Sequence, residues 1–141
     1  RSLLVPVDFS PSSLLAIRCA RRVAPKAEIV LLHTFELPFE GHLRYASVDE
    51  DTINRYRVIA KQEAIQKLHA LRKDAGLPPH TVRYVVLHGV PSLSILEQEQ
   101  EQSCDLIVMG KHGESALEDL LIGSVTKRVL AESQSDVLVS V

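Results

Sequence analysis

The sequence predicts an α/β domain built on an open, five-stranded parallel sheet with helices on both faces, of the Rossmann-like kind. Five short apolar runs alternate with longer segments of helical periodicity, which is typical of strand–helix–strand units. The runs are largely apolar, and residues 29–32 are apolar throughout, as expected for strands that are covered on both faces. The 141 residues contain no internal repeat and no linker, so we expect residues 1–141 to form one domain.

The first strand is expected at residues 3–7, and the first helix begins at Ser10-Pro11. Serine is a favoured helix N-cap, and proline fits the first helical position because it needs no hydrogen-bond donor there. The larger apolar side chains of this helix are expected to form its buried stripe, namely Leu14, Leu15, Cys19 and Val23.

The second strand is expected at residues 27–34, and residues 36–49 follow as an irregular segment. A long helix then begins at about Asp51 and ends before Gly76, since glycine and the prolines after it stop a helix. Its apolar residues recur at steps of three and four and are expected to form one buried face: Ile53, Tyr56, Ala60, Ala64, Leu68, Leu71 and Ala75.

The third strand is expected at residues 82–87, and a helix starts at Pro91. Residues 97–102 of that helix are polar, and we expect them to form a solvated face without a function. A strand at 106–109, a helix from Val125 and a strand at 136–141 complete the chain.

The stretch 105–125 carries the main functional signal. A buried strand is followed by Gly110 and Gly113, and after nine further residues Gly123-Ser124 precedes the last helix. Glycine lets backbone N–H groups approach a ligand closely, and the start of a helix leaves its first N–H groups unpaired and partly positive. The pattern therefore indicates a phosphate-binding site, although isolated glycines of this kind also occur in ordinary turns.

The spacing G-x2-G-x9-G-S resembles the nucleotide-binding signature of the universal stress protein family, and so do the segments that begin and end it, DLIVMGKHG and GSVTKRVL. The likeness continues in the family's order through VPVDFS at 5–10, LLH at 31–33, HGVP at 88–91 and VLV at 137–139, and so spans nearly the whole chain. It implies the family's ATP-binding subgroup. It also implies the strand order 3-2-1-4-5, which places the strands before Asp8 and Gly110 side by side.

The resemblance implies an adenine-nucleotide site for ATP, or else AMP or ADP, with or without Mg²⁺. Asp8 is expected at the adenosine end beside Pro6 and Val7; a helix-capping or surface aspartate is the alternative. Thr34 stands where the family often has an apolar residue, and we expect His33 before it to be structural.

The phosphate end is expected to combine backbone N–H groups with the Ser124 hydroxyl and the charges of Lys111 and, when protonated, His112. Glu99 replaces a small residue of the family, which should affect packing more than binding. The full expected binding set is Pro6, Val7, Asp8, Thr34, Met109, Gly110, His112, Gly113, Gly123, Ser124 and Val125.

Several classes of function are disfavoured by composition and by missing motifs. The net charge of −2 and 4% aromatic residues argue against nucleic-acid binding, and no apolar run reaches the roughly 20 residues needed for membrane insertion. Cys19 and Cys104 have neither metal nor disulfide-framework spacing, which indicates a cytoplasmic protein. The chain has no P-loop, dinucleotide fingerprint or nucleophile elbow, and we assign no catalytic or metal-binding residue.

The resemblance thus implies an adenine-nucleotide-binding stress-response or regulatory protein with at most slow ATP hydrolysis, and we expect it to be cytoplasmic. The alternatives are an α/β enzyme that hydrolyses ATP slowly or transfers adenylyl groups, and a structural dimer module without nucleotide. The last strand, 136–141, is apolar and by the resemblance lies at the sheet edge, so we expect a homodimer joined through it. Cover by a chain segment beyond the given sequence is the alternative for this edge.

Overall fold

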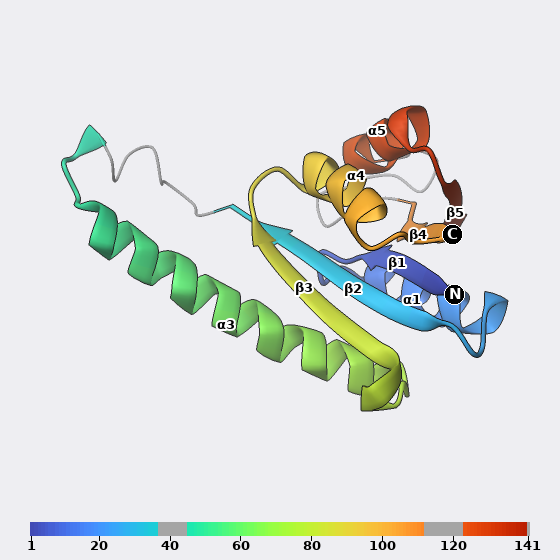
Figure 1. The fold of residues 1–141 in the computed structure, drawn as a ribbon. Helices are drawn as coiled ribbons and strands as arrows, with labels where there is room; N and C mark the ends of the chain where they lie inside the picture. Colours follow the sequence, from blue (N-terminus) through green and yellow to red (C-terminus); the bar gives the residue numbers. More distant parts are fainter. Residues whose placement is uncertain (37–44, 112–122, 141) are drawn as a thin grey trace.

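The computed structural model describes residues 1–36, 45–111 and 123–140, and its strands form one parallel sheet (Figure 1). The strands are β1 (Ser2–Pro6), β2 (Glu28–Phe35), β3 (Val82–His88), β4 (Leu106–Gly110) and β5 (Asp136–Ser140). Their order is β3-β2-β1-β4-β5, and every pairing is parallel. The predicted fold class and strand order are confirmed.

Helices cover both faces of the sheet. They are α1 (Pro11–Val23), α3 (Glu50–Asp74), α4 (Pro91–Glu101) and α5 (Ser124–Glu132), and a short 3-10 turn η1 (Pro79–Thr81) precedes β3. α4 and α5 lie together over one face, whereas α1 and α3 pack on the other (Figure 1). None of the helices in the described ranges is long and apolar enough to cross a membrane.

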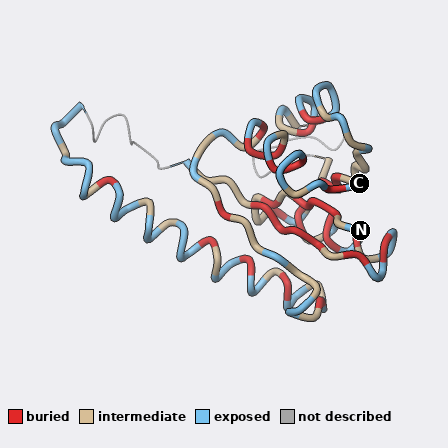
Figure 2. Tube along the Cα trace, in the orientation of Figure 1, coloured by how far each residue is buried: buried red, intermediate tan, exposed pale blue. Residues whose placement is uncertain are grey.

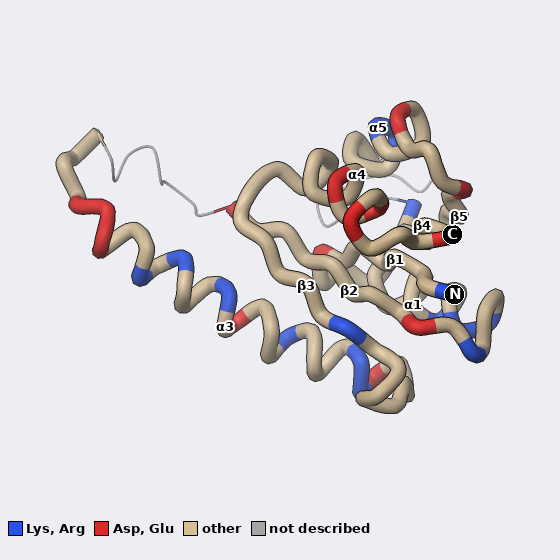
Figure 3. The backbone as a smooth tube through the Cα atoms, viewed as in Figure 1, with Lys and Arg blue, Asp and Glu red and all other residues tan. Residues whose placement is uncertain are grey.

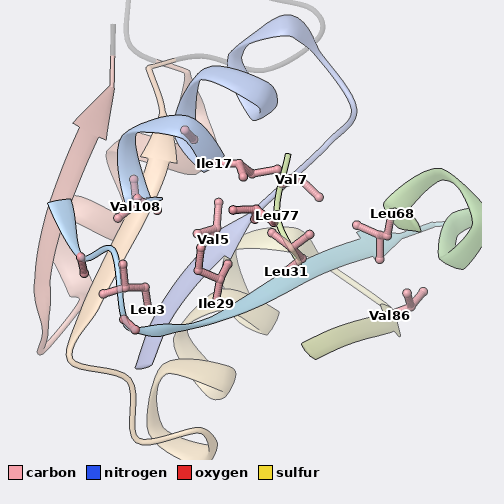
Figure 4. Packing of buried hydrophobic residues seen from close by; sticks show 14 of the residues in the cluster. Leu3, Val5, Val7, Ile17, Ile29, Leu31, Leu68, Leu77, Val86 and Val108 are labelled. Atoms are coloured by element: carbon pink, nitrogen blue, oxygen red, sulfur yellow. The ribbon is translucent and has the colours of Figure 1, made fainter. Parts of the chain in front are cut away.

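The register of the strands explains their unbroken apolar runs. Leu4 on β1 pairs with Val30 on β2, and both side chains enter the core under α4 and α5. The next pair, Val5 and Leu31, faces α1 and α3 (Figure 4). Because successive residues enter different cores, both must be apolar, and Figure 2 shows the middle of the central strands buried.

The predicted buried stripe of α1 is wrong for Leu15 and Val23, whereas Cys19 is partly buried against the core as expected. Leu15 and Val23 are 47% and 53% exposed. The residues that α1 buries are mostly small: Ser13, Ala16, Ile17 and Ala20. This helix lies close against β4 and β1, and a close approach of backbones selects small side chains over large ones.

The predicted face of α3 is buried at Ile53, near the start of the helix, and again along its second half. Ala64 and Leu68 are buried, and Leu71 packs against the same core over β2 and β3. Tyr56, in the first half, is 47% exposed. Arg72 is buried instead, because its Nε donates to the Tyr84 hydroxyl at 2.9 Å and its Nη1 donates to a backbone carbonyl at 2.8 Å.

The polar run of α4 is not a solvated face throughout, although the helix carries three glutamates (Figure 3). Gln98 and Glu99 are only 5% and 3% exposed. Glu99 accepts hydrogen bonds from the Ser133 hydroxyl and from the backbone N–H groups of Gln134 and Ser135, at 3.2 and 3.0 Å for the latter two. The carboxylate therefore anchors the turn between α5 and β5, which agrees with the expected effect of Glu99 on packing.

The ionisation of Glu99 is tied to these contacts. Burial by itself raises the pKa of this carboxyl. The hydrogen bonds from Ser133, Gln134 and Ser135 outweigh burial and hold the pKa of Glu99 below its ordinary value of 4.5. The side chain is thus a buried anion at neutral pH, and its donors are supplied by a single turn.

Candidate functional site

Three of the predicted site residues share one face at the carboxyl edge of the sheet. Pro6 pairs with Leu32 in the parallel register, and Leu32 faces α4 and α5. Met109 on β4 enters the same core, and Thr34 lies two residues beyond Leu32 on β2. Since partners in a parallel register point to the same side and residues two apart share a face, Pro6, Met109 and Thr34 lie together at this edge.

Val7 points the other way. Its side chain is buried in the core under α1 and α3. Its N–H donates to the Leu32 carbonyl at 2.8 Å, and its carbonyl accepts a hydrogen bond from Nδ1 of His33 at 2.9 Å. Only the backbone of Val7 thus lies at the edge, and His33 is the structural histidine that the sequence predicts.

Asp8 belongs to a hydrogen-bonded turn between β1 and α1. Its Oδ1 accepts from the Ser10 N–H and from the Ser13 hydroxyl, each at 3.0 Å. The Ser13 hydroxyl oxygen in turn accepts from the Asp8 N–H at 3.0 Å. These contacts stabilise the turn and hold the Asp8 carboxylate at the carboxyl edge of the sheet, while the N-cap position of α1 belongs to Ser10.

Phe9 allows the chain to turn sharply after Asp8. It adopts φ +66, a left-handed conformation that is rare for a bulky residue. Its ring contacts the His33 ring at a centroid distance of 4.5 Å, and Lys67 Nζ lies 5.4 Å from the Phe9 centroid. Ring packing from β2 and α3 thus holds the strained residue next to Asp8.

Gly110 ends β4 where the start of α1 crowds it. A Cβ on Gly110 would lie 2.6 Å from Cβ of Ser12, closer than real Cβ contacts allow. The Gly110 carbonyl accepts a hydrogen bond from the Thr126 hydroxyl at 3.0 Å. Absence of a side chain at Gly110 therefore lets α1 pack against the end of β4, while the Gly110 carbonyl links β4 to α5.

The last helix begins at the same edge. Lys111 N–H donates to the Ser140 carbonyl at 3.1 Å, and Gly123 N–H donates to the Lys111 carbonyl at 3.0 Å. The second bond fixes Gly123, the N-cap of α5, beside the end of β4. By helix geometry the first N–H groups of α5, from Ser124 onwards, have no partner within the helix and form a positive end that suits an anion.

The predicted residues of the glycine motif fall into two groups. Gly123 is the N-cap of α5, Ser124 is exposed in its first turn, and Val125 packs against the core under α4 and α5. His112 and Gly113 lie outside the described residues.

Hydroxyl groups without a hydrogen-bond partner gather at this edge. The side-chain oxygens of Ser10, Thr34 and Ser140 are buried and bond to no described group. Ser10 occupies the N-cap position of α1 as predicted, but its hydroxyl makes no capping bond. Buried polar groups are normally satisfied, so these three mark the end of the sheet where a ligand can supply bonds that the protein does not.

Sequence reasoning missed Ser12, Ser13 and Thr126, which shape the site by contact and not by a recognisable motif. The run of serines after Pro11 is the one signal that could have indicated Ser12 and Ser13. No group of three His, Cys, Asp or Glu side chains within 1–36, 45–111 and 123–140 could hold a metal ion.

Comparison with known proteins gives a consistent result. The Universal stress protein family (Usp) matches this chain over residues 1–140. Universal stress protein MJ0531 of Methanocaldococcus jannaschii is 32% identical over 142 residues, covering 99% of this chain and 81% of the relative. The solved structure of MJ0577, a hypothetical protein, superposes with a TM-score of 0.80 at 29% identity, covering 99% of this chain and 94% of that one.

Two further solved structures contain nucleotides. A universal stress protein in complex with cAMP has a TM-score of 0.66 at 24% identity, covering 100% of this chain and 96% of that one. The universal stress protein from Archaeoglobus fulgidus in complex with dAMP has a TM-score of 0.61 at 20% identity, covering 99% and 97%. At these identities the likeness shows a shared fold.

Proposed function

This chain belongs to the Universal stress protein family, and on that premise we propose that it binds an adenine nucleotide at the carboxyl edge of its sheet. The observation that carries the proposal is the bond from Gly123 N–H to the Lys111 carbonyl, which sets the start of α5 beside the end of β4. The cAMP and dAMP complexes of proteins with this fold support the class of ligand.

The phosphates of the nucleotide bind at the start of α5. There the N–H groups of Ser124 and Val125 and the Ser124 hydroxyl are the donors. The sequence motif adds His112 and Gly113 to this set. Charge at the helix N-terminus and close backbone donors suit a phosphate better than a neutral ligand.

The base lies over Pro6 and Met109 on the α4 and α5 face, with Asp8 at the adenosine end. The backbone of Thr34 is suited to contact the base. In a parallel ladder the N–H and carbonyl of one residue point to the same side, and those of residues two apart do so as well. The Leu32 carbonyl points to β1, where it accepts a hydrogen bond from the Val7 N–H. The N–H and carbonyl of Thr34, two residues later, therefore also point to the β1 side, into the space past Val7.

We further propose that the ligand is ATP, with AMP or ADP as its alternatives and Mg²⁺ as a companion of the phosphates. The protein acts as a cytoplasmic stress-response regulator with no catalytic residue of its own, within one domain spanning residues 1–141, and it works as a homodimer joined through β5. The exposed edge position of β5 in the sheet supports the dimer.

The phosphate site is tested with Ser124→Glu. Ser124 is exposed at the first position of α5, where an acidic side chain favours the helix by its interaction with the dipole. The same charge repels phosphate. We therefore expect unchanged or raised thermal stability together with at least a tenfold loss of ATP affinity, or about 1.4 kcal/mol, measured by calorimetry with magnesium.

Ala131→Glu is the matched control. Ala131 is exposed on α5, seven residues after Ser124 and so on the same side of the helix, about 10 Å further along it. This variant should keep the affinity of the parent protein. An equal loss of ATP affinity in both variants would show a general charge effect and contradict the placement of the phosphates. The proposed function would be refuted if the parent protein carried no adenine nucleotide after purification and bound none when it was added.

A further inference from the structure

Among the described residues, the Thr34 hydroxyl has no hydrogen-bond partner, and the described side chains beside it on the same face are apolar. Its oxygen is buried and bonds to no described group. On the same face, Leu32 precedes it on β2 and Leu87 is its register partner on β3, and both pack into the apolar core under α4 and α5. A threonine in a strand has few rotamers, so the hydroxyl cannot easily turn away to find water.

The position of Thr34 relative to the phosphate site defines which part of a nucleotide it can reach. The phosphate donors stand at the start of α5, beside β4, and Thr34 stands on β2. Only β1 lies between β4 and β2, so the two sites are two strand spacings apart, about 10 Å. A nucleotide whose phosphates lie at α5 and whose base crosses β1 therefore brings the far edge of the base to Thr34.

In a purine nucleotide the edge farthest from the sugar belongs to the six-membered ring and carries the substituent at position 6. A hydroxyl can both accept and donate, so it can accept from an amino group there. We propose that the Thr34 hydroxyl is a specificity-determining group that accepts a hydrogen bond from the 6-amino group of the bound adenine. This inference rests on the proposed function, because it needs an adenine nucleotide at the same edge.

The proposal predicts opposite effects of one substitution on stability and on affinity. Thr34→Val replaces the hydroxyl by a methyl group of similar size. In the free protein this removes an unsatisfied buried group and should raise the melting temperature by about 3 °C. In the complex it removes a hydrogen bond to the ligand, and ATP affinity should fall about five- to tenfold. A side chain with only a structural role would not separate the two effects in this way.

Thr81→Val is the matched control, since its hydroxyl donates to the Pro78 carbonyl at 2.8 Å in η1, at the start of β3 and away from the carboxyl edge. It should lower the melting temperature and leave ATP affinity unchanged. The second probe is purine ribonucleoside triphosphate, which lacks the 6-amino group. The parent protein should bind it about as weakly as Thr34→Val binds ATP, and Thr34→Val should bind it no more weakly than the parent does.

The outcomes separate this inference from the function on which it rests. If the parent binds ATP and Thr34→Val binds it equally well, the role of Thr34 is refuted and the proposed function stands. An equal loss of affinity for ATP and for the analogue in Thr34→Val would also refute the contact with the 6-amino group. If the parent binds no adenine nucleotide by calorimetry with magnesium, both proposals fail together.

Discussion

Replacement of Glu99 by glutamine should strongly destabilise the protein, although the residue lies in a run of six polar side chains. The buried carboxylate accepts bonds from the Ser133 hydroxyl and from the N–H groups of Gln134 and Ser135. Glutamine keeps one acceptor oxygen and turns an amino group towards the remaining donors. Two lost bonds to a charged acceptor, at about 1.5 kcal/mol each, give a loss of about 3 kcal/mol in the free energy of unfolding. For a chain of this size that lowers the melting temperature by about 10 °C.

The effect should depend on pH with a defined sign. The pKa of Glu99 is lower in the folded protein than its ordinary value of 4.5, so the folded state favours the ionised form. The stabilisation is therefore complete above the unfolded-state pKa and is lost as the pH falls through the folded-state pKa. The difference in the free energy of unfolding between the parent and Glu99→Gln should be constant above about pH 5 and should shrink below about pH 4.5.

Urea denaturation at pH 7 and at a series of lower values measures both effects. Glu97→Gln is the control, because Glu97 is exposed on the same helix and its replacement should change stability by less than about 0.5 kcal/mol. The reasoning would be refuted if Glu99→Gln matched this control at pH 7, or if its deficit stayed constant in acid.

Two further predictions concern the ends of β4 and β5. Gly110→Ala should lower the free energy of unfolding by about 1–3 kcal/mol, because the added methyl group overpacks against Ser12. Combining it with Ser12→Gly should restore part of that loss. Gly76→Ala, which meets nothing within 4 Å but has φ +73, should lose about 1 kcal/mol that Ser12→Gly does not restore. Val139→Pro should convert the proposed homodimer to a monomer in light scattering, while the circular dichroism spectrum stays unchanged. The reason is that the Ser140 carbonyl bonds to β4, so the N–H of Val139, one residue earlier, points to the free edge of the sheet, where proline removes a donor. A parent protein that is monomeric at micromolar concentration would contradict the dimer.

The sequence predicted the secondary structure well where local signals decide it. Pro11 and Pro91 occupy the first positions of α1 and α4, and the observed strands agree with the predicted ones within a residue or two. Continuous apolar runs sufficed to predict a parallel sheet, because only strands covered on both faces need them. Of the candidate site, the resemblance implied that the strands before Asp8 and Gly110 would lie side by side, and β1 and β4 are indeed neighbours in the sheet.

Side-chain environment was harder to predict because it depends on the partner surface. Hydrophobicity alone selected Leu15 and Val23 for the core of α1, whereas close contact with β4 selected Ala16 and Ala20. The polar residue Glu99 is buried because a turn 34 to 36 residues later supplies its donors. No local pattern in the helix contains that information.

The amino-acid sequence by itself determined the order and type of the elements, since caps, prolines and apolar periodicity act within a few residues along the chain. The tertiary structure alone decided which groups were left unsatisfied at the carboxyl edge. The Ser13 hydroxyl became part of the Asp8 turn, whereas the hydroxyls of Ser10 and Thr34 remained buried without a described partner. The physical reason is that a hydrogen bond needs a donor and an acceptor within about 3 Å, and only the folded arrangement of separate segments sets those distances.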